Sequence, residues 1–342
     1  MKTILLHTDE IAVEVRPDEG GRVSSLRCLE RGTEFLTASH RRGPSAPAGL
    51  DAQFRNGPCA GVEDCLPTVA ACGAHTAGGP VPDHGDLWQL PWNLLEPTGS
   101  VSLHMEAHCF SRPLSIRKHM RVSGRVLRID YQIRNTGPQP TSLLFALHPL
   151  LAIAAGDRIV LPDDLRTLAL THKRGYQMQH AGDTVTWPAT LVNGEWLDLS
   201  RTGAATDGLA AMLYTPPLRH GTCGLYRSQQ EQGILLRFDP ARLPCLGIWL
   251  SYGGWPDTPD AGASDTSGAP DAIGAPDTTL QYAVALEPTT APFGSLDDAQ
   301  RAEAAVPLQP GQHTGWSVEF EITTPGQSYA AFLQQVQRIA AP

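Results

Sequence analysis

The chain has 342 residues, of which 41% are hydrophobic, so it can form a sizeable core and general disorder is excluded. The formal net charge is −9, from 26 Lys and Arg against 35 Asp and Glu, and no basic stripe is present, so nucleic acid and anionic membranes are poor candidates as partners. No apolar run approaches the ~20 residues of a membrane-spanning helix, and the run at 4–6 is too short for the core of a signal peptide, so we expect a cytoplasmic protein.

Short strands separated by turns account for most of the chain. Apolar and polar residues alternate in several segments, and 33 glycines and 29 prolines mark the turns between them. In chain order, the predicted strands are 11–16, 101–106, 115–122, 126–134, 141–148, 233–238, 246–252, 281–286 and 317–322. Many short strands with frequent turns are typical of an all-β sandwich or barrel.

Helical patterns are few. A first helix is predicted over 296–305, with Ser295 as its N-cap and acidic residues in its first turn. A second is predicted over 327–340, where apolar residues recur on one face. Both lie near the C-terminal end, so helices contribute little to the predicted architecture.

Residues 256–279 differ in composition from the rest of the chain. The segment 255–279 holds five Asp, no Lys or Arg, and only Ile273 as a large aliphatic residue. Such a segment buries too little apolar surface to offset the entropy of ordering it. We therefore expect a mobile loop inserted into one domain that covers 1–342, because the strand patterns on both sides are alike.

The seven cysteines are an odd number, and without an export signal we expect reduced thiols, mostly buried. Cys59, Cys65 and Cys72 are spaced by six and seven residues, with His75 three further on. A zinc site usually contains a closer cysteine pair, so no metal is predicted. The sequence has neither a P-loop nor a Gly-x-Ser-x-Gly nucleophile motif.

Three titratable residues lie in settings that suit acid–base chemistry. His84 lies in a Pro/Gly turn with two acids (VPDHGDLW, 81–88), and such loops place polar groups at the rim of a pocket. His148 and Glu287 each follow an apolar run and precede a proline, so a strand would hold them rigidly. A carboxylate at the end of a buried strand has a raised pKa and is a better base at neutral pH. The structural alternatives are a hydrogen-bonded turn for His84, a buried hydrogen-bonded ring for His148 and a salt bridge for Glu287.

The blocks around these residues resemble, in the same order, those of the aldose 1-epimerase (galactose mutarotase-like) family, in particular its less characterised bacterial branch. The similar blocks are GVEDCLPT (61–68), PDHGDLWQLPW (82–92), LHP (147–149), FDP (238–240), LPCLGIW (243–249) and LEPTTAPFGSL (286–296). The resemblance extends over roughly residues 10–325. It implies a large antiparallel β-sandwich, the galactose mutarotase-like supersandwich, with a few short helices and a cleft on one sheet.

The resemblance also implies interconversion of the α and β anomers of a sugar without a cofactor. By position, Glu287 is the general base for the anomeric hydroxyl, His148 the general acid for the ring oxygen, and His84 a hydrogen-bonding group that polarises the ring oxygen. A Glu with a raised pKa and a His that titrates near neutrality suit concerted ring opening.

Five further residues are candidates for contacts with the sugar. Trp88 and Trp249 are candidates for stacking on an apolar sugar face, with core packing as the alternative. Glu63 and Asp64 are candidates for accepting sugar hydroxyls, with solvent exposure as the alternative. The family's sugar-binding Asp has no clear counterpart, and Asp239 is slightly favoured over Asp207.

The sequence departs from the pattern of the galactose mutarotases in several places. Leu150 and Leu151 replace the aromatic residues that follow the His, and the insertion at 256–279 is not shared. Those enzymes carry an Asn-Arg pair where this chain has Glu63 and Asp64, and the nearest arginine is Arg55. This departure argues against galactose and against a phosphorylated sugar that needs an arginine clamp, and the identity of the sugar, including whether it is acidic, stays open.

We expect an isomerase whose partner is a small-molecule sugar, as a monomer or a homodimer. The alternatives are a carbohydrate-binding protein without catalysis, which would not need both an acid and a base, and another reaction on a sugar-like substrate, since a fold alone does not determine the reaction.

Overall fold

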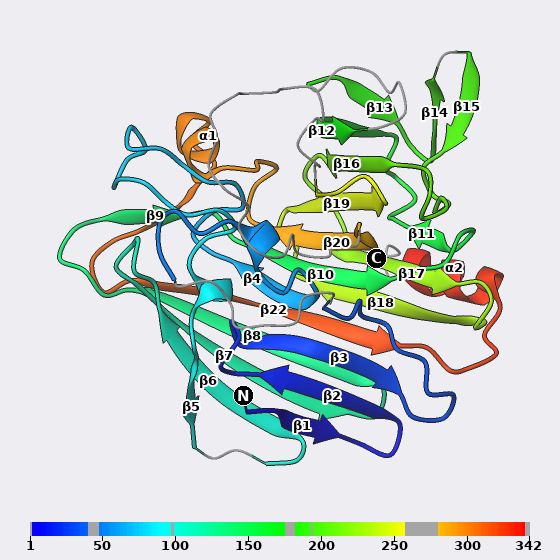
Figure 1. The fold of residues 1–342 in the computed structure, drawn as a ribbon, viewed down its shortest axis with the longest axis horizontal. Coiled ribbons are helices and arrows are strands. Elements are labelled where there is room, and N and C mark those ends of the chain that lie inside the picture. Colours follow the sequence, from blue (N-terminus) through cyan, green and yellow to red (C-terminus); the bar gives the residue numbers. More distant parts are fainter. Residues whose placement is uncertain are drawn as a thin grey trace, which may run out of the picture.

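The computed structural model describes residues 2–39, 48–96, 99–174, 182–192, 194–256 and 280–338. Two large antiparallel sheets stack on one core, and helices are few and short (Figure 1). This confirms the all-β sandwich predicted from the sequence. The insertion predicted at 256–279 lies, from residue 257 onward, outside the described residues.

The first sheet has ten strands. His148 and Glu287 lie in two of them, and His84 lies in the chain between β4 and the next element. In order across the sheet the strands are β1 (Ile4–His7), β2 (Ile11–Arg16), β3 (Arg22–Cys28), β4 (Gly61–Cys65), β10 (Ala146–Ala152), β20 (Tyr282–Thr289), β19 (Cys245–Tyr252), β16 (Leu209–Tyr214), β12 (Thr167–Arg174) and β13 (Thr184–Thr186). The centre of this sheet, β4, β10 and β20, therefore brings together three distant parts of the sequence.

The second sheet has eight strands. In order they are β11 (Arg158–Val160), β17 (Thr222–Arg227), β18 (Gln232–Phe238), β22 (His313–Ile322), β8 (Val126–Asn135), β7 (Leu114–Ser123), β6 (Ser102–His108) and β5 (Asn93–Leu95). Two further ribbons pair β14 (Ala189–Val192) with β15 (Glu195–Asp198), and β9 (Thr141–Leu143) with β21 (Val306–Leu308). The helices are α1 (Leu296–Arg301) and α2 (Tyr329–Arg338), with short 3-10 turns η1 (Phe54–Asn56) and η2 (Leu87–Gln89).

Each predicted strand overlaps an observed one, but several predicted boundaries are wrong. Residues 141–148 form two strands, β9 and β10, which belong to different sheets. The break falls at Leu144 and Phe145, which are both fully buried, so no polar residue or glycine marks it in the sequence. The strand predicted to end before Glu287 continues to Thr289, so Glu287 lies inside β20.

Both predicted helices are confirmed, and each is shorter in the structure than predicted. Ser295 is the N-cap of α1, and its hydroxyl accepts a 3.0 Å hydrogen bond from the Asp298 N–H. α2 packs on the outer face of the second sheet, where its Phe332 lies over Gly224 and Gly233 (Figure 1). A Cβ at Gly233 would lie 2.2 Å from the Phe332 ring, so the glycine makes room for it. No helix among the described residues is long and apolar enough to cross a bilayer.

Alternation along β4 decides which side chains reach the core. Val62 packs in the core between the sheets, and Asp64 points the same way. The Asp64 carboxylate accepts hydrogen bonds from Lys118 of β7 at 2.6 Å and from the Tyr131 hydroxyl of β8 at 2.7 Å. Because side chains of a strand alternate, Glu63 lies on the opposite face of the sheet.

Candidate active site

A row of side chains crosses the face of the ten-stranded sheet that points away from the core. Glu63 of β4 is paired with His148 of β10, and the register of β10 with β20 places His148 beside Glu287. Glu287 is paired with Gly247 of β19, which is paired with Tyr214 of β16. Five strands thus contribute one residue each to this cross-strand row, and antiparallel pairing brings facing Cβ atoms to within about 5 Å.

His148 and Glu287 form the centre of the cross-strand row. His148 Nε2 lies 3.6 Å from Glu287 Oε1. Both residues are buried, with 5% and 1% of their surface exposed. Burial raises the pKa of Glu287 to about 8. Burial, together with the charge of His84, lowers the pKa of His148 to about 3. At neutral pH the pair therefore holds one proton, on the carboxyl group.

Gly247 leaves space beside the Glu287 side chain. A Cβ at this position would lie 3.2 Å from Glu287 Cβ and Oε2, and 2.7 Å from the terminal methyl of Met212. Any other residue at 247 would press on the carboxyl group from the neighbouring strand. The glycine of the LPCLGIW block therefore has a local explanation in the site.

Glu63 is a second buried carboxyl group on this face. It is 2% exposed, and neither of its oxygens makes a hydrogen bond to a described residue. Burial raises its pKa to about 8, against the opposing charge of Arg22. His148 Nδ1 is likewise buried without a hydrogen bond to the described part of the chain. Unpaired buried polar atoms are rare in native proteins, and three of the thirteen among the described residues lie on these two cross-strand neighbours.

His84 is held beside His148 by the loop before η2. Their ring centroids lie 5.5 Å apart with the planes nearly perpendicular. Asp83 Oδ1 lies 2.8 Å from His84 Nδ1, and its other oxygen accepts the Phe54 N–H at 2.9 Å. The Phe54 ring stacks on His84 at 3.8 Å. Burial opposes the negative charge of Asp83, but the hydrogen bond and charge of His84 lower its pKa.

This loop adopts a backbone conformation that few residues favour. His84 has a φ of 57° and Gly85 a φ of 71°. A Cβ at Gly85 would lie 2.1 Å from the carbonyl oxygen of Leu66, so glycine is required there. A non-glycine residue with positive φ costs free energy and is frequent at functional sites. The His-Gly pair thus turns the His84 ring toward the cross-strand row.

The two predicted stacking tryptophans occupy different places. Trp88 is 2% exposed, packs edge-on against Phe54, and donates its indole N–H to the Asp83 carbonyl oxygen at 2.8 Å. It therefore supports the His84 loop, as in the packing alternative. Trp249 is partly exposed on the site face of β19 and donates to Gln281 Oε1 at 2.7 Å. His172 and Trp255 lie beside its ring, at 5.9 and 6.5 Å between centroids.

Of the acidic residues predicted to contact the sugar, only Glu63 lies in the cross-strand row. Glu63 lies in the cross-strand row, whereas Asp64 points into the core and is paired there, which does not fit the expected role with a sugar. Asp239 is exposed in the turn after β18 and accepts the Ala241 N–H at 2.9 Å. Asp207 accepts the Ala204 N–H at 2.9 Å in another turn. Arg55 is exposed in η1, next to Phe54.

Four residues of the site were not predicted from the sequence. Asp83 and Phe54 orient His84, while Gly247 and Tyr214 extend the cross-strand row. Asp83 is adjacent to His84 in the resembling block, so that signal was available. Phe54 and Tyr214 are aromatic residues in ordinary apolar contexts, and only the strand order brings them here.

The cysteines do not form a metal site in the described part of the chain. All seven are free thiols and five are buried, as expected. Cys65 lies on β4, while Cys72 contacts the Thr68 hydroxyl and Cys59 donates to the Phe54 carbonyl oxygen. No group of three or more His, Cys, Asp or Glu side chains in the described ranges has a geometry that holds a metal ion.

The fold is that of galactose mutarotase-like proteins. The Slr1438 protein from Synechocystis sp. PCC 6803 matches with a TM-score of 0.66 and 17% identity, over 94% of this chain and 96% of that one. A protein from Escherichia coli K12, provisionally identified as an aldose 1-epimerase, matches with 0.65 and 15%, over 94% and 99%. The galactose mutarotase related enzyme from Lactobacillus acidophilus matches with 0.63 and 12%, over 94% and 98%. No protein-family model and no curated protein sequence matches the chain.

Proposed function

We propose that this protein, which has the galactose mutarotase-like fold, is an aldose 1-epimerase that interconverts sugar anomers by general acid–base ring opening. The observation that carries the proposal is the pair of His148 and Glu287, 3.6 Å apart and buried on adjacent strands. Ring opening removes a proton from the anomeric hydroxyl and adds one to the ring oxygen. Both oxygens are bonded to the anomeric carbon, so the base and the acid must lie side by side, as these two groups do.

The proton of the pair can be followed through the step. Burial places it on Glu287 in the free protein, so it must first pass to His148, which turns Glu287 into the base and His148 into the acid. In ring opening, the Glu287 carboxylate takes the hydroxyl proton while the His148 imidazolium gives its proton to the ring oxygen, and the pair returns to the distribution of the free protein. Rotation about C1–C2 and the reverse transfers close the ring on the other face. The pair keeps a single proton throughout, so a turnover requires no proton from solvent.

His84 completes the proposed site as a hydrogen-bonding group. Its Nδ1 is engaged by Asp83, which leaves Nε2 for the substrate. Stacking on Phe54 fixes the plane of the ring. A group held in this way hydrogen-bonds the sugar without reorganising, which favours the transition state. The partly exposed Trp249 ring is the platform that we assign to an apolar sugar face.

The test is the rate at which freshly dissolved pure anomers equilibrate, followed by polarimetry or by NMR of the anomeric protons. The panel should include neutral and acidic aldoses, since the substrate is one of them. Acceleration of one sugar identifies the substrate class. The rate should fall above pH about 8, where the pair loses its single proton.

Two outcomes would contradict the proposal. No acceleration across the panel, together with saturable shifts of protein resonances, would identify a carbohydrate-binding protein on this fold. An accelerated rate that is unchanged by Glu287→Gln and by His148→Asn would remove the pair from the mechanism and place the catalysis elsewhere.

A further inference from the structure

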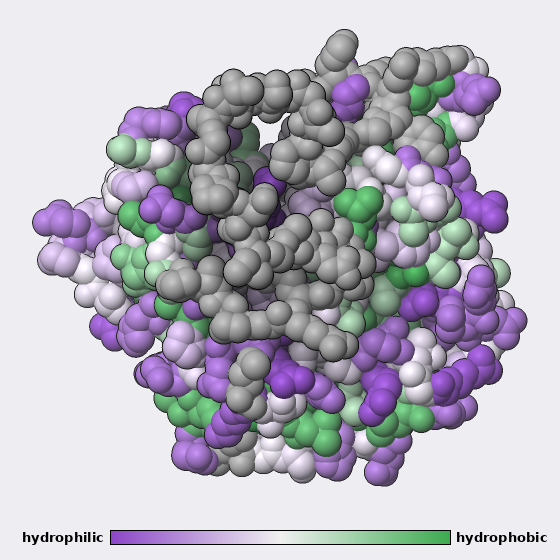
Figure 2. Space-filling model, in the orientation of Figure 1, coloured by the Kyte–Doolittle hydropathy of each residue, from purple (hydrophilic) through white to green (hydrophobic). Residues whose placement is uncertain are grey.

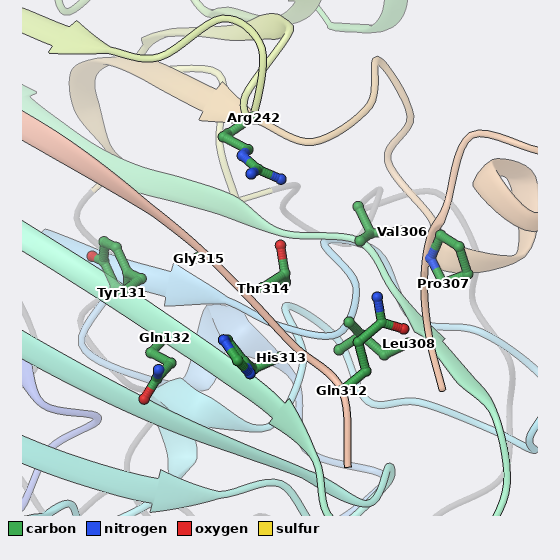
Figure 3. Close-up of a pocket in the computed structure, with 10 residues that line it drawn as sticks. All are labelled: Tyr131, Gln132, Arg242, Val306, Pro307, Leu308, Gln312, His313, Thr314 and Gly315. Carbon is green, nitrogen blue, oxygen red and sulfur yellow. The ribbon is translucent and has the colours of Figure 1, made fainter. Parts of the chain in front are cut away.

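A cavity lies away from the cross-strand row, where the ends of β8 and β22 meet β21. Its volume is about 460 Å³, within the range of about 300–1,000 Å³ typical of small-molecule sites and near its lower end. Figure 3 shows its walls, which come from these three strands and from Arg242 in the turn between β18 and β19. None of Glu63, His84, His148 and Glu287 lines it.

One positively charged side chain lines this cavity, although the protein is acidic. The lining includes Arg242 and no described Asp or Glu, in a chain with a net charge of −9. The His313 side chain lies on the other face of β22 from Thr314, because side chains of a strand alternate. Arg242 is an exposed residue, and its guanidinium makes no hydrogen bond or ion pair with any described residue, while most other described arginines have such a partner. A guanidinium without a partner offers a fork of N–H donors that suits a carboxylate or a phosphate.

The turn that carries Arg242 is rigid. Its N–H and that of Leu243 donate to the Asp239 carbonyl oxygen at 3.0 and 2.9 Å. The Asp239 carboxylate accepts the Ala241 N–H at 2.9 Å. Asp239 therefore has a position in the fold that differs from the sugar contact expected from the sequence, since it shapes the turn that presents Arg242 to the cavity.

The opposite wall is also built in advance. The buried Asn135 side chain donates to the Leu308 carbonyl oxygen at 3.0 Å. Its backbone N–H donates to the Gln312 carbonyl oxygen, and its own carbonyl oxygen accepts the Gly311 N–H, both at 3.0 Å. This buried residue thus fixes the segment from Leu308 to His313. A preformed cavity costs a ligand little ordering entropy.

Polar groups near Arg242 suit the hydroxyls of a sugar. In the view of Figure 3, the Thr314 hydroxyl and the Arg242 guanidinium point toward one another across the cavity. The side-chain oxygen of Gln312 accepts the Gln309 N–H at 2.8 Å, which leaves its NH₂ group for a ligand. Val306 and Pro307, which are accessible, supply an apolar wall, as the C–H face of a sugar ring requires.

We infer that this cavity binds a small acidic monosaccharide, with its anionic group on Arg242 and its hydroxyls on Thr314 and Gln312. The site is separate from the proposed catalytic pair and does not depend on the proposed function. A sugar phosphate and a uronic acid share the chemistry that Arg242 recognises.

Isothermal titration calorimetry tests this inference with four probes: glucose 6-phosphate, glucuronate, glucose and inorganic phosphate. Wild type should bind at least one of the two acidic sugars more tightly than glucose or phosphate. The stronger of the two identifies the anionic group. Arg242→Gln should weaken that binding about tenfold or more, because one charge-assisted contact is lost. Thr314→Val should weaken it less and keep the same preference among probes.

The matched control is Arg219→Gln, which removes the same charge from a side chain that is 83% exposed. It should bind like wild type, and Arg242→Gln should equilibrate sugar anomers at the wild-type rate. Equal affinity in wild type and Arg242→Gln would overturn the inference. An equal loss of affinity in Arg219→Gln would show that the binding depends only on the net charge of the protein, which would overturn the inference. The absence of binding of either acidic sugar at millimolar concentration would also overturn it.

Discussion

Glu63 and Asp64 are adjacent in the sequence and equally buried, yet they face opposite sides of one strand and have opposite surroundings. Asp64 lies between the sheets, where Lys118 and Tyr131 satisfy its two oxygens. Glu63 lies in the cross-strand row, where neither oxygen is paired with a described residue and its pKa is raised to about 8. A buried carboxylate with full partners stabilises the fold, whereas an unpaired one stores a free-energy cost that is typical of functional sites.

The largest effect is expected at the proposed catalytic pair. Glu287→Gln keeps the shape of the side chain and removes the base, so anomer equilibration should slow by about 10²–10⁴-fold, while sugar binding is kept. His148→Asn should cost a comparable factor. Polarimetry measures the rate and calorimetry the binding. The exposed Glu195→Gln is the matched control, and a loss of rate there equal to that of Glu287→Gln would contradict the assignment.

Asp64 should affect stability rather than catalysis. Asp64→Asn leaves the Lys118 ammonium buried without its anion, so the free energy of unfolding should fall by about 3–5 kcal/mol. Urea denaturation measures this change. The fraction that remains folded should equilibrate anomers near the wild-type rate. If instead the rate is lost while stability is kept, Asp64 belongs to the site and the contrast with Glu63 fails.

Glu63 should make stability depend on pH in the direction that a raised pKa requires. The folded state binds the Glu63 proton more tightly than the unfolded state, with a pKa of about 8 against 4.5. Its contribution to stability is therefore fully present below pH 4.5 and is lost as the pH rises toward 8. Glu63→Gln removes this titration, so its unfolding free energy relative to wild type should increase across that interval by up to a few kcal/mol. Denaturation at pH 4.5, 6 and 8 measures it, and a difference that does not vary with pH would show that Glu63 is charged in the folded state.

The smallest effect should separate the two tryptophans. Trp249→Ala removes the partly exposed platform, so KM for the sugar should rise about fivefold while kcat stays near wild type, from the loss of about 1 kcal/mol of stacking. Trp88→Phe should instead lower kcat, because the His84 loop loses the hydrogen bond to the Asp83 carbonyl oxygen. Steady-state kinetics on both variants tests the division. The same pattern of change in both variants would contradict it.

Much of the fold was readable from local pattern. Alternating residues in 115–122 and 126–134 predict β7 and β8, since a half-buried strand has one polar and one apolar face. The prediction of a single strand over 141–148 was wrong because a strand buried on both faces shows no alternation. Nothing local marks where β9 ends and β10 begins. The sequence analysis did not predict β1 (residues 4–7), nor the longer strands β3, β12, β16 and β17.

Some residues of the candidate site could likewise be predicted from local features of the sequence. His84, His148 and Glu287 could be named because each stands beside a proline or a glycine in a block that resembles a known family, and those local features are present in the sequence itself. The sequence by itself also determined the sandwich, through strand-length periodicity and turn residues.

Only the tertiary structure decided which neighbours these residues have. Strand order across the ten-stranded sheet places Glu63, His148 and Glu287 in one row from positions 63, 148 and 287. The twofold alternation of β4 sends Glu63 to that row and Asp64 to the core. The pKa of each carboxyl group then follows from burial and partners, which are long-range properties that no local stretch of sequence contains.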